Sequence, residues 1–312
     1  MIRLDHREPF PENLRGAIVA LGNFDGFHQG HQAVVGEALR WAQSESRPCI
    51  VATFDPHPVR HFFPKAEPFR LTTLEQRQEL FAEAGADAML VFHFDDALAS
   101  MEPSDWVQQM LAGHIGAGGV VTGKDFTFGK GRTGNPAVLR DEGSAFGITA
   151  RAVDAVHDEI GPISSSRIRD ALKDGGCETA TRLLTRPFAI RGIVEHGDKV
   201  GRTIGFPTAN LTLGSYLRPR YGIYAVTGKL PGGRIVQGAA NIGVRPTFDP
   251  PKELLEPHFF DFAEDLYGQE IEVAFHHFLR PEKKFDGLDA LTEQMQRDCD
   301  EARKLLSAHQ LN

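Results

Sequence analysis

The pattern of secondary structure changes once along the 312-residue chain, after Arg186-Pro187. Before this point, short apolar runs typical of strands alternate with segments whose apolar residues recur at helical spacing. After it, strand-like runs follow one another and are separated by turns such as Pro231-Gly232-Gly233. Because the chain is long enough for two hydrophobic cores, we expect two domains, residues 1–182 and 183–312.

The first half predicts an α/β domain with a mainly parallel sheet, because strands and helices alternate along it. We expect strands over residues 17–21, 49–54, 88–94 and 119–122. The expected helices are 31–44, 74–84, 103–113, 165–173 and 178–184.

The second half predicts a small antiparallel barrel or sandwich. Its expected strands are 188–195, 222–229, 234–240, 255–262 and 270–278. The last segment, 288–306, repeats its apolar residues on one helical face, which predicts a terminal helix packed on the barrel.

Composition excludes several classes of protein. A hydrophobic content of 41% is ordinary for a globular chain, and the net charge of -8 argues against a bulk nucleic-acid binder. No apolar stretch is long enough to span a membrane, and the N-terminal MIRLDHREPF lacks the apolar core of a signal peptide. The three cysteines, Cys49, Cys177 and Cys299, are odd in number and far apart. We therefore expect reduced thiols in a cytoplasmic protein without nucleic-acid or membrane partners.

A glycine-rich stretch, GNFDGFHQGH, lies between the first predicted strand and helix. At the carboxyl end of a parallel strand, this arrangement points backbone N–H groups and a helix dipole toward an anion. Gly22, Gly26 and Gly30 let the main chain approach a phosphate closely. His28 and His31 can donate hydrogen bonds to phosphoryl oxygens. The same stretch also fits a plain glycine turn with two surface histidines.

Two later stretches carry basic or hydroxyl groups. ISSSRIR, residues 163–169, opens a helix with serines followed by arginines, which suits phosphate binding but also fits an ordinary N-cap with a solvated basic turn. GKDFTFGKGRTGN, residues 123–135, is a glycine-rich and basic loop. It is not a P-loop, because Gly131 stands where Ser or Thr must hold magnesium.

The second half contains GDKVGRTIGFPTANL, residues 197–211. Pro207 fixes the backbone just before an extended segment, so that Thr208 and Asn210 project to the same side. Two neutral oxygen ligands suit Mg²⁺, which takes further ligands from water and nucleotide phosphates. A Pro-Thr turn with a supporting Asn is the alternative.

GNFDGFHQGH, TFDPHP, GKDFTFG and ISSSRIR, in that order, resemble the adenylyltransferase module of bacterial bifunctional riboflavin kinase/FAD synthetases. The HxGH motif relates this module to the wider nucleotidyltransferase superfamily. The resemblance implies a Rossmann-like fold that joins ATP and FMN into FAD and pyrophosphate. Since FMN brings its own phosphate oxyanion as nucleophile, this reaction needs no general base.

The resemblance also assigns residues in this module. His28 and His31 would act catalytically on the ATP phosphates, while Arg169, with Ser165 and Ser166, would hold the β,γ-phosphate side. Asp125 would lie near the ATP and magnesium. The residues expected to surround the nucleotide are Gly22, Asn23, Phe24, Asp25, Gly26 and Gly30.

GFPTAN, NIGVRPTF, LEPHFFDF, DLYG and RPEKKF resemble the riboflavin kinase module of the same family, whose fold is a Greek-key β-barrel with a C-terminal helix. The resemblance implies that Glu256 is the base near the riboflavin 5′-hydroxyl and that Thr208 and Asn210 bind the Mg²⁺ of ATP. Pro257 stands where the family often has a β-branched residue, which suits an edge or a bulge. The glycines expected against the ATP phosphates are Gly197, Gly201 and Gly205.

The leading hypothesis is therefore an enzyme that converts riboflavin to FMN and FMN to FAD, with ATP as co-substrate and Mg²⁺ as cofactor. A nucleotidyltransferase for another phosphorylated acceptor is an alternative, but it leaves GFPTAN and NIGVRPTF unexplained. A flavin sensor without turnover is a second alternative, and a sensor has no need of His28, His31 or Glu256.

Overall fold

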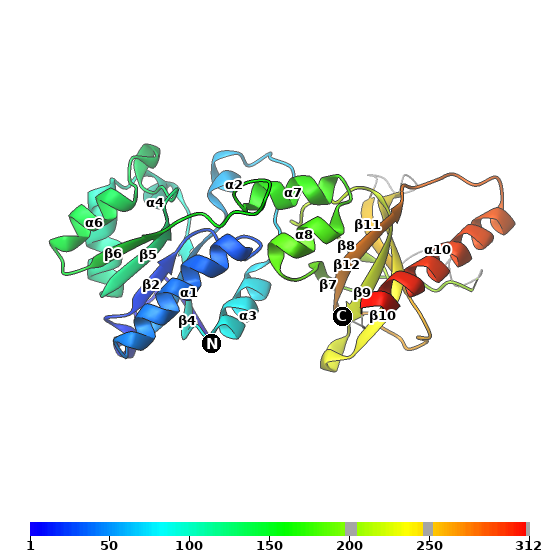
Figure 1. The fold of residues 1–312 in the computed structure, drawn as a ribbon, viewed down its shortest axis with the longest axis horizontal. Helices are drawn as coiled ribbons and strands as arrows, with labels where there is room; N and C mark the ends of the chain where they lie inside the picture. Colours follow the sequence, from blue (N-terminus) through cyan, green and yellow to red (C-terminus); the bar gives the residue numbers. More distant parts are fainter. Residues whose placement is uncertain (197–204, 246–251, 310–312) are drawn as a thin grey trace. The chain divides into compact units, whose positions relative to one another are not determined.

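The computed structural model describes residues 1–196, 205–245 and 252–309, which belong to two compact units (Figure 1). Residues 1–67 and 72–164 form the first unit, and the second contains residues 68–71 and the chain from Ser165 onward. Helices α7 (Ser165–Lys173) and α8 (Cys177–Leu184) thus group with the second half. Helix α8 packs on strands of the second half. The division between the two units therefore falls between residues 164 and 165, ahead of the predicted boundary at residue 182.

The first unit is built on a six-stranded sheet in the order β1-β4-β3-β2-β5-β6, with every pairing parallel. This confirms the predicted α/β domain. The strands are β1 (Ile2–Asp5), β2 (Ile18–Leu21), β3 (Cys49–Asp55), β4 (Ala88–His93), β5 (Gly119–Gly123) and β6 (Thr149–Val153). The sequence pattern indicated the four inner strands and missed β1 and β6, which form the two edges.

Helices cover both faces of this sheet. They are α1 (Gln29–Ser44), α2 (Pro58–Phe62), α3 (Leu74–Ala84), α4 (Asp96–Ser100), α5 (Pro103–Trp106) and α6 (Pro136–Ser144), with a π-helix at Val107–Ile115 and short 3-10 turns at Glu12–Leu14 and Lys130–Arg132. The helix expected over residues 103–113 is therefore α5 continued by the wider π-helical turns.

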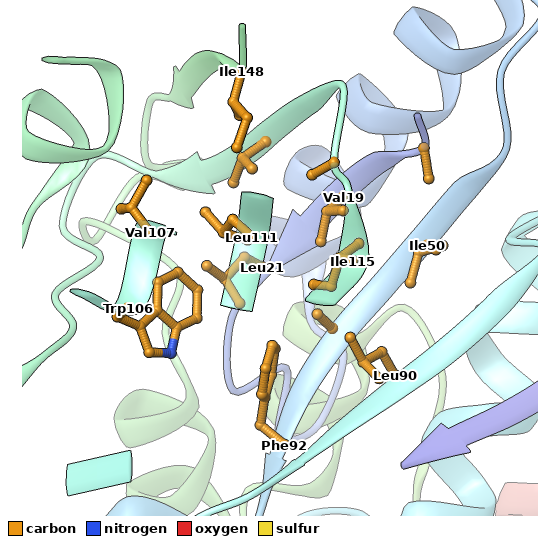
Figure 2. Packing of buried hydrophobic residues seen from close by; sticks show 14 of the residues in the cluster. Val19, Leu21, Ile50, Leu90, Phe92, Trp106, Val107, Leu111, Ile115 and Ile148 are labelled. Atoms are coloured by element: carbon orange, nitrogen blue, oxygen red, sulfur yellow. The ribbon is translucent and has the colours of Figure 1, made fainter. Parts of the chain in front are cut away.

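The inner strands are buried on both faces, which explains their continuous apolar sequences. On one face, Val19 and Leu21 of β2 pack with Trp106 and Leu111, as Figure 2 shows. On the other face, Ile18 and Ala20 belong to a second cluster with residues of α1 and α3. Successive residues of one strand thus serve two cores.

Strand β2 lies at the point where the order of the sheet reverses. The chain passes from β2 to β3 and β4 on one side, whereas β5 and β6 lie on the other. In open α/β sheets, ligands bind beyond the carboxyl ends of the strands at such a point. The stretch GNFDGFHQGH follows β2 directly at this edge.

The second unit contains an antiparallel sheet in the order β7-β12-β9-β10-β11-β8. Its ends approach each other, because Glu195 and Asn210 form an antiparallel bridge just beyond β7 and β8. The predicted small barrel is thereby confirmed. The strands are β7 (Phe188–Ile193), β8 (Leu211–Thr212), β9 (Gly222–Lys229), β10 (Ile235–Arg245), β11 (Lys252–Phe259) and β12 (Glu270–Arg280), with a 3-10 turn at Pro231–Gly233.

The terminal helix α10 (Leu288–His309) packs on β9, β10 and β12, as its apolar spacing predicted. Cys299, Ala302 and Leu306 are buried against Ala225 and Ala239 of the barrel. Its first residue, Leu288, is 60% exposed, so the helix makes its apolar contacts further along. Among the described residues, no helix combines the length and the apolar character needed to cross a membrane.

We predict that Gly119→Ala destabilises the first unit. A Cβ at residue 119 would lie 2.3 Å from the Trp41 ring, and overpacking of this kind costs about 1–3 kcal/mol. Gly36→Ala is the matched control, because a Cβ there meets only the flexible end of Arg40 and alanine favours the helix by roughly 0.5–1 kcal/mol.

Urea unfolding followed by tryptophan fluorescence tests this, because the two tryptophans of the chain, Trp41 and Trp106, both lie in the first unit. The midpoint falls for Gly119→Ala and holds or rises for Gly36→Ala. Equal midpoints for the two variants would contradict the tight contact with Trp41.

Candidate active sites

The loop between β2 and α1 contains three residues whose φ lies in the left-handed region. Phe24, Gly26 and Phe27 have φ values of 50°, 86° and 44°. For the phenylalanines this conformation is unfavourable and requires support from packing. The support is visible at Phe24, which is 1% exposed and packs on Phe81. Its ring also covers Gly22, where a Cβ would lie 3.0 Å from the ring.

Asp25 is 3% exposed and anchors this loop by hydrogen bonds to Thr72. Its Oδ1 accepts hydrogen bonds from the Thr72 backbone N–H at 3.0 Å and from the Thr72 hydroxyl at 3.2 Å. The Thr72 hydroxyl oxygen in turn accepts a bond from the N–H of Gly26. Phe24 and Asp25, both predicted near the nucleotide, therefore shape the loop from its buried side.

The start of the loop is tied to a buried arginine. Arg77 of α3 is 2% exposed and donates from Nη1 to the Asn23 carbonyl at 3.0 Å and to the Thr53 hydroxyl at 2.8 Å. The Thr53 hydroxyl donates to the same carbonyl at 2.8 Å. The ends of β2 and β3 are thus joined through one guanidinium.

His28 caps helix α1. Its Nδ1 accepts a hydrogen bond from the backbone N–H of His31 at 3.4 Å, so the ring proton of the neutral imidazole is on Nε2. The two histidine rings are stacked, with centroids 3.6 Å apart. Gly30 makes this possible, because a Cβ there would lie 3.1 Å from Cε1 of His28. The spacing of the HxGH motif therefore has a steric reason, and it brings both predicted histidines together.

Asp125 follows β5, the neighbour of β2 in the sheet. It is exposed, and its Oδ1 lies 2.8 Å from the position that a Cβ of Gly123 would occupy. Since parallel strands end at the same edge, Asp125 belongs to the same edge of the sheet as the β2–α1 loop.

The other predicted phosphate ligands belong to the second unit. Ser165 begins α7, Ser166 follows it, and Arg169 lies one turn further. Arg169 donates from Nε to the Phe69 carbonyl at 2.9 Å, and its guanidinium lies over the Phe69 ring. Their role at the β,γ-phosphates stays a prediction.

In the barrel, the PTAN segment runs beside strand β11. The N–H of Ala209 donates to the Pro257 carbonyl at 2.9 Å. The Nδ1 of His258 donates to the Pro207 carbonyl at 2.8 Å. These two bonds place Thr208 next to the part of β11 that carries Glu256.

Asn210 is 8% exposed and its carbonyl accepts a hydrogen bond from the Glu195 N–H at 2.8 Å. Thr208 and Glu256 are half-buried. The structure thus brings the two predicted metal ligands and the predicted base to one side of the barrel. Gly205 is exposed with φ of 83°, and Gly197 and Gly201 lie outside the described residues.

Pro257 lies on β11 just past the residues that pair with the short edge strand β8. The two residues of β8 pair with Leu254 and Leu255, and beyond them the Ala209 N–H donates to the Pro257 carbonyl. Proline has no N–H to donate, but at this edge position no hydrogen bond of a central strand is lost. This position fits the edge that the sequence indicated.

An ion pair fixes the start of β11. Arg218 donates from Nε to Glu253 at 2.8 Å, and the Tyr221 hydroxyl donates to the other carboxylate oxygen. Burial opposes ionisation of Glu253, but these bonds outweigh it and keep its pKa below the usual value. Burial, together with the carboxylate, raises the pKa of Tyr221 to about 12.

Sequence reasoning missed Thr72, Arg77, His258 and Asn241, which stands opposite Glu256 on β10. Arg77 was detectable in principle, because it occupies the apolar face of a predicted helix together with Phe81. The partners of the others come from distant segments, which no local pattern reveals.

Comparison with known families agrees with this arrangement. The FAD synthetase family model matches residues 10–167, and the riboflavin kinase model matches residues 184–306. The fold and the two sites thus define a two-domain enzyme with a nucleotidyltransferase half and a kinase half. The chain belongs to the bifunctional riboflavin kinase/FMN adenylyltransferase family.

Relatives of this name match almost the whole chain. One from Haemophilus influenzae is 37% identical, covering 95% of this chain and 96% of its own length. One from Escherichia coli K12 is 38% identical, with 91% and 90% covered, and one from Bacillus subtilis is 39% identical, with 93% of each covered.

A solved structure from Streptococcus pneumoniae, described as a macrolide-efflux protein, has the same fold. It is 30% identical, has a TM-score of 0.85, and the match covers 96% of this chain and 97% of that one. Efflux is said of that protein, whereas both family models match enzymes of flavin metabolism.

We predict that Gly30→Ala lowers FAD formation from FMN and ATP by roughly tenfold or more, because the new methyl group displaces the His28 ring from the helix cap. Steady-state rates of FAD formation measure the effect. Gly36→Ala on the same helix is the control and retains the wild-type rate. Wild-type FAD formation in Gly30→Ala would show that the close contact of Gly30 with His28 is not required.

Proposed function

We propose that the first unit transfers the adenylyl group of ATP to FMN at the β2–α1 loop. The observation that carries this proposal is the state of His28, whose Nδ1 accepts the bond that caps α1. Nε2 is then the protonated nitrogen and acts as a donor. The loop lies beyond β2 at the reversal of strand order, where a phosphate also meets the N-terminus of a long helix.

The chemistry there is a displacement at the α-phosphorus of ATP. A phosphate oxygen of FMN forms a bond to this phosphorus, the bond to the bridging oxygen breaks, and pyrophosphate leaves with the electron pair. His28 and His31 donate hydrogen bonds to the phosphoryl oxygens as negative charge develops. Because the nucleophile is already an anion, neither histidine has to remove a proton.

The barrel carries out the other step, phosphorylation of riboflavin. The 5′-hydroxyl oxygen attacks the γ-phosphorus of ATP, ADP leaves, and the hydroxyl proton passes to the Glu256 carboxylate. Support comes from the hydrogen bond between Ala209 and Pro257, which places the PTAN segment beside this base. Glu256 therefore lies next to the residues proposed to hold the nucleotide.

Thr208 and Asn210 are the residues we propose to hold Mg²⁺. Their neutral oxygens fit this ion, which prefers hard oxygen donors and keeps several ligands from water and phosphates. Among the described residues, no group of three or more His, Cys, Asp and Glu is arranged to hold a metal ion. When bound with ATP, Mg²⁺ neutralises phosphate charge during transfer.

The cytoplasm is the compartment we propose. Cys49, Cys177 and Cys299 are all free and buried. Burial raises the pKa of Cys49 and Cys177 to about 12 and that of Cys299 to about 11, so all three remain thiols. Reduced, unpaired cysteines are typical of a reducing compartment.

Reciprocal variants test the division of labour. Glu256→Gln lowers FMN formation from riboflavin by about 10²–10⁴-fold, since the proton has no acceptor, and leaves FAD formation from supplied FMN unchanged. The double variant His28→Ala/His31→Ala lowers FAD formation from supplied FMN and leaves FMN formation from riboflavin unchanged. Chromatography of the flavin products measures both rates. Loss of both activities in either variant would disprove two separate sites.

The magnesium proposal has its own test. Thr208→Val removes one oxygen donor at nearly constant volume, so we expect the Mg²⁺ concentration for half-maximal kinase activity to rise by roughly tenfold. Thr212→Val on β8 is the matched control, because Thr212 is exposed and stands outside the PTAN segment. An unchanged Mg²⁺ requirement in Thr208→Val would remove this residue from the ion site.

A further inference from the structure

Asn241 on β10 stands directly opposite the proposed base. The antiparallel register pairs Asn241 with Glu256 on β11 and with Ile223 on β9. Directly opposed residues have their Cβ atoms about 5 Å apart on one face of the sheet. Glu256 is thus the polar cross-strand neighbour of Asn241, and the other neighbour is apolar.

A second carboxylate fixes how the Asn241 amide is turned. Nδ2 of Asn241 donates to Oε1 of Glu282 at 3.2 Å. An ionised carboxylate only accepts hydrogen bonds, so the NH₂ end of the amide must face Glu282 and the carbonyl end must face away from it. Glu282 occupies space that Gly243 leaves open, because a Cβ there would lie 2.0 Å from the same Oε1.

The segment that carries Glu282 is itself anchored on the terminal helix. Arg280, at the end of β12, donates from Nε and Nη2 to the two carboxylate oxygens of Asp298 at 2.9 and 2.7 Å. Asp298 is 4% exposed. A bidentate pair of this kind defines the direction in which the chain leaves β12.

The remaining atom of the amide, Oδ1, is buried and accepts no hydrogen bond from the described part of the chain. A buried acceptor without a donor costs about 1–3 kcal/mol, and such an atom in a native structure calls for an explanation. In the kinase reaction proposed above, Glu256 gains a proton and becomes a hydrogen-bond donor on the strand directly opposite Asn241.

We propose that Asn241 is a positioning residue for Glu256 and accepts a hydrogen bond from its carboxyl group once that group has taken the proton of the riboflavin 5′-hydroxyl. This inference rests on the role proposed for Glu256. The bond is absent while Glu256 is ionised and forms as the proton arrives, so it favours the products of proton transfer over the bound substrate. Glu282 keeps Oδ1 turned toward the base.

Kinase kinetics test this inference. Asn241→Leu keeps the approximate size and removes the amide, so we expect kcat for FMN formation to fall about tenfold, as for loss of one hydrogen bond, with both KM values within about twofold. In the Glu256→Gln background the same change causes no further loss. FAD formation from supplied FMN stays at the wild-type rate, and Gln237→Leu, on the same strand, retains the wild-type kcat.

Glu282 gives a second route that leaves Asn241 in place. Glu282→Leu removes the acceptor that turns the amide, so kcat falls roughly threefold or more, whereas Glu282→Gln retains an acceptor oxygen and restores most of the rate. This pair is informative even if Asn241→Leu folds poorly, because Glu282 is exposed.

Three results would overturn the positioning role alone: an unchanged kcat in Asn241→Leu, a higher KM for riboflavin at unchanged kcat, or a further tenfold loss in the Glu256→Gln background. The second of these would mean that Oδ1 binds the substrate hydroxyl. A fully active Glu256→Gln would instead remove the base assignment on which the inference rests, and the single variants distinguish the two failures.

Discussion

The carboxyl edge of the first sheet depends on one buried charge. The Arg77 guanidinium is 2% exposed, and a charge at such a position is tolerated only with polar partners in good geometry. It finds them in the Asn23 carbonyl and the Thr53 hydroxyl. Meeting this requirement fixes the end of β2 relative to β3 and α3, and therefore the point from which the loop to His28 departs.

The barrel positions its site by a different means. Its proposed ligands lie on an extended segment added to a sheet edge, held by main-chain bonds such as Ala209 to Pro257. A proline on the strand limits how far regular pairing can continue there, because it has no N–H to offer. Since Pro257 can only accept, its main-chain link to the PTAN segment is the single bond from the Ala209 N–H to its carbonyl.

The sequence was sufficient to predict those elements whose structure is determined by burial alone. Strands β2 to β5 are covered on both faces, so their apolar runs and the helices between them were predictable. Strand β6 is largely exposed and its sequence, TARAV, carries no such run. At the site, the positions of His28 and Gly30 follow from local sterics. Arg77 and Thr72 act on residues 54 and 46 positions away, respectively, so only the folded chain reveals them.

The two reactions need different groups from the protein, because one nucleophile is an anion and the other is a neutral hydroxyl. The two sites accordingly supply different groups. An anionic nucleophile needs donors near the phosphorus, and the helix start with its stacked histidines offers donors. A neutral hydroxyl needs an acceptor for its proton, and β11 offers a carboxylate beside an amide whose oxygen has no donor among the described residues. The stacked histidines offer no carboxylate to take the proton of a neutral hydroxyl, and the Glu256 carboxylate would repel an anionic nucleophile. Each constellation therefore suits one nucleophile and is poorly suited to the other.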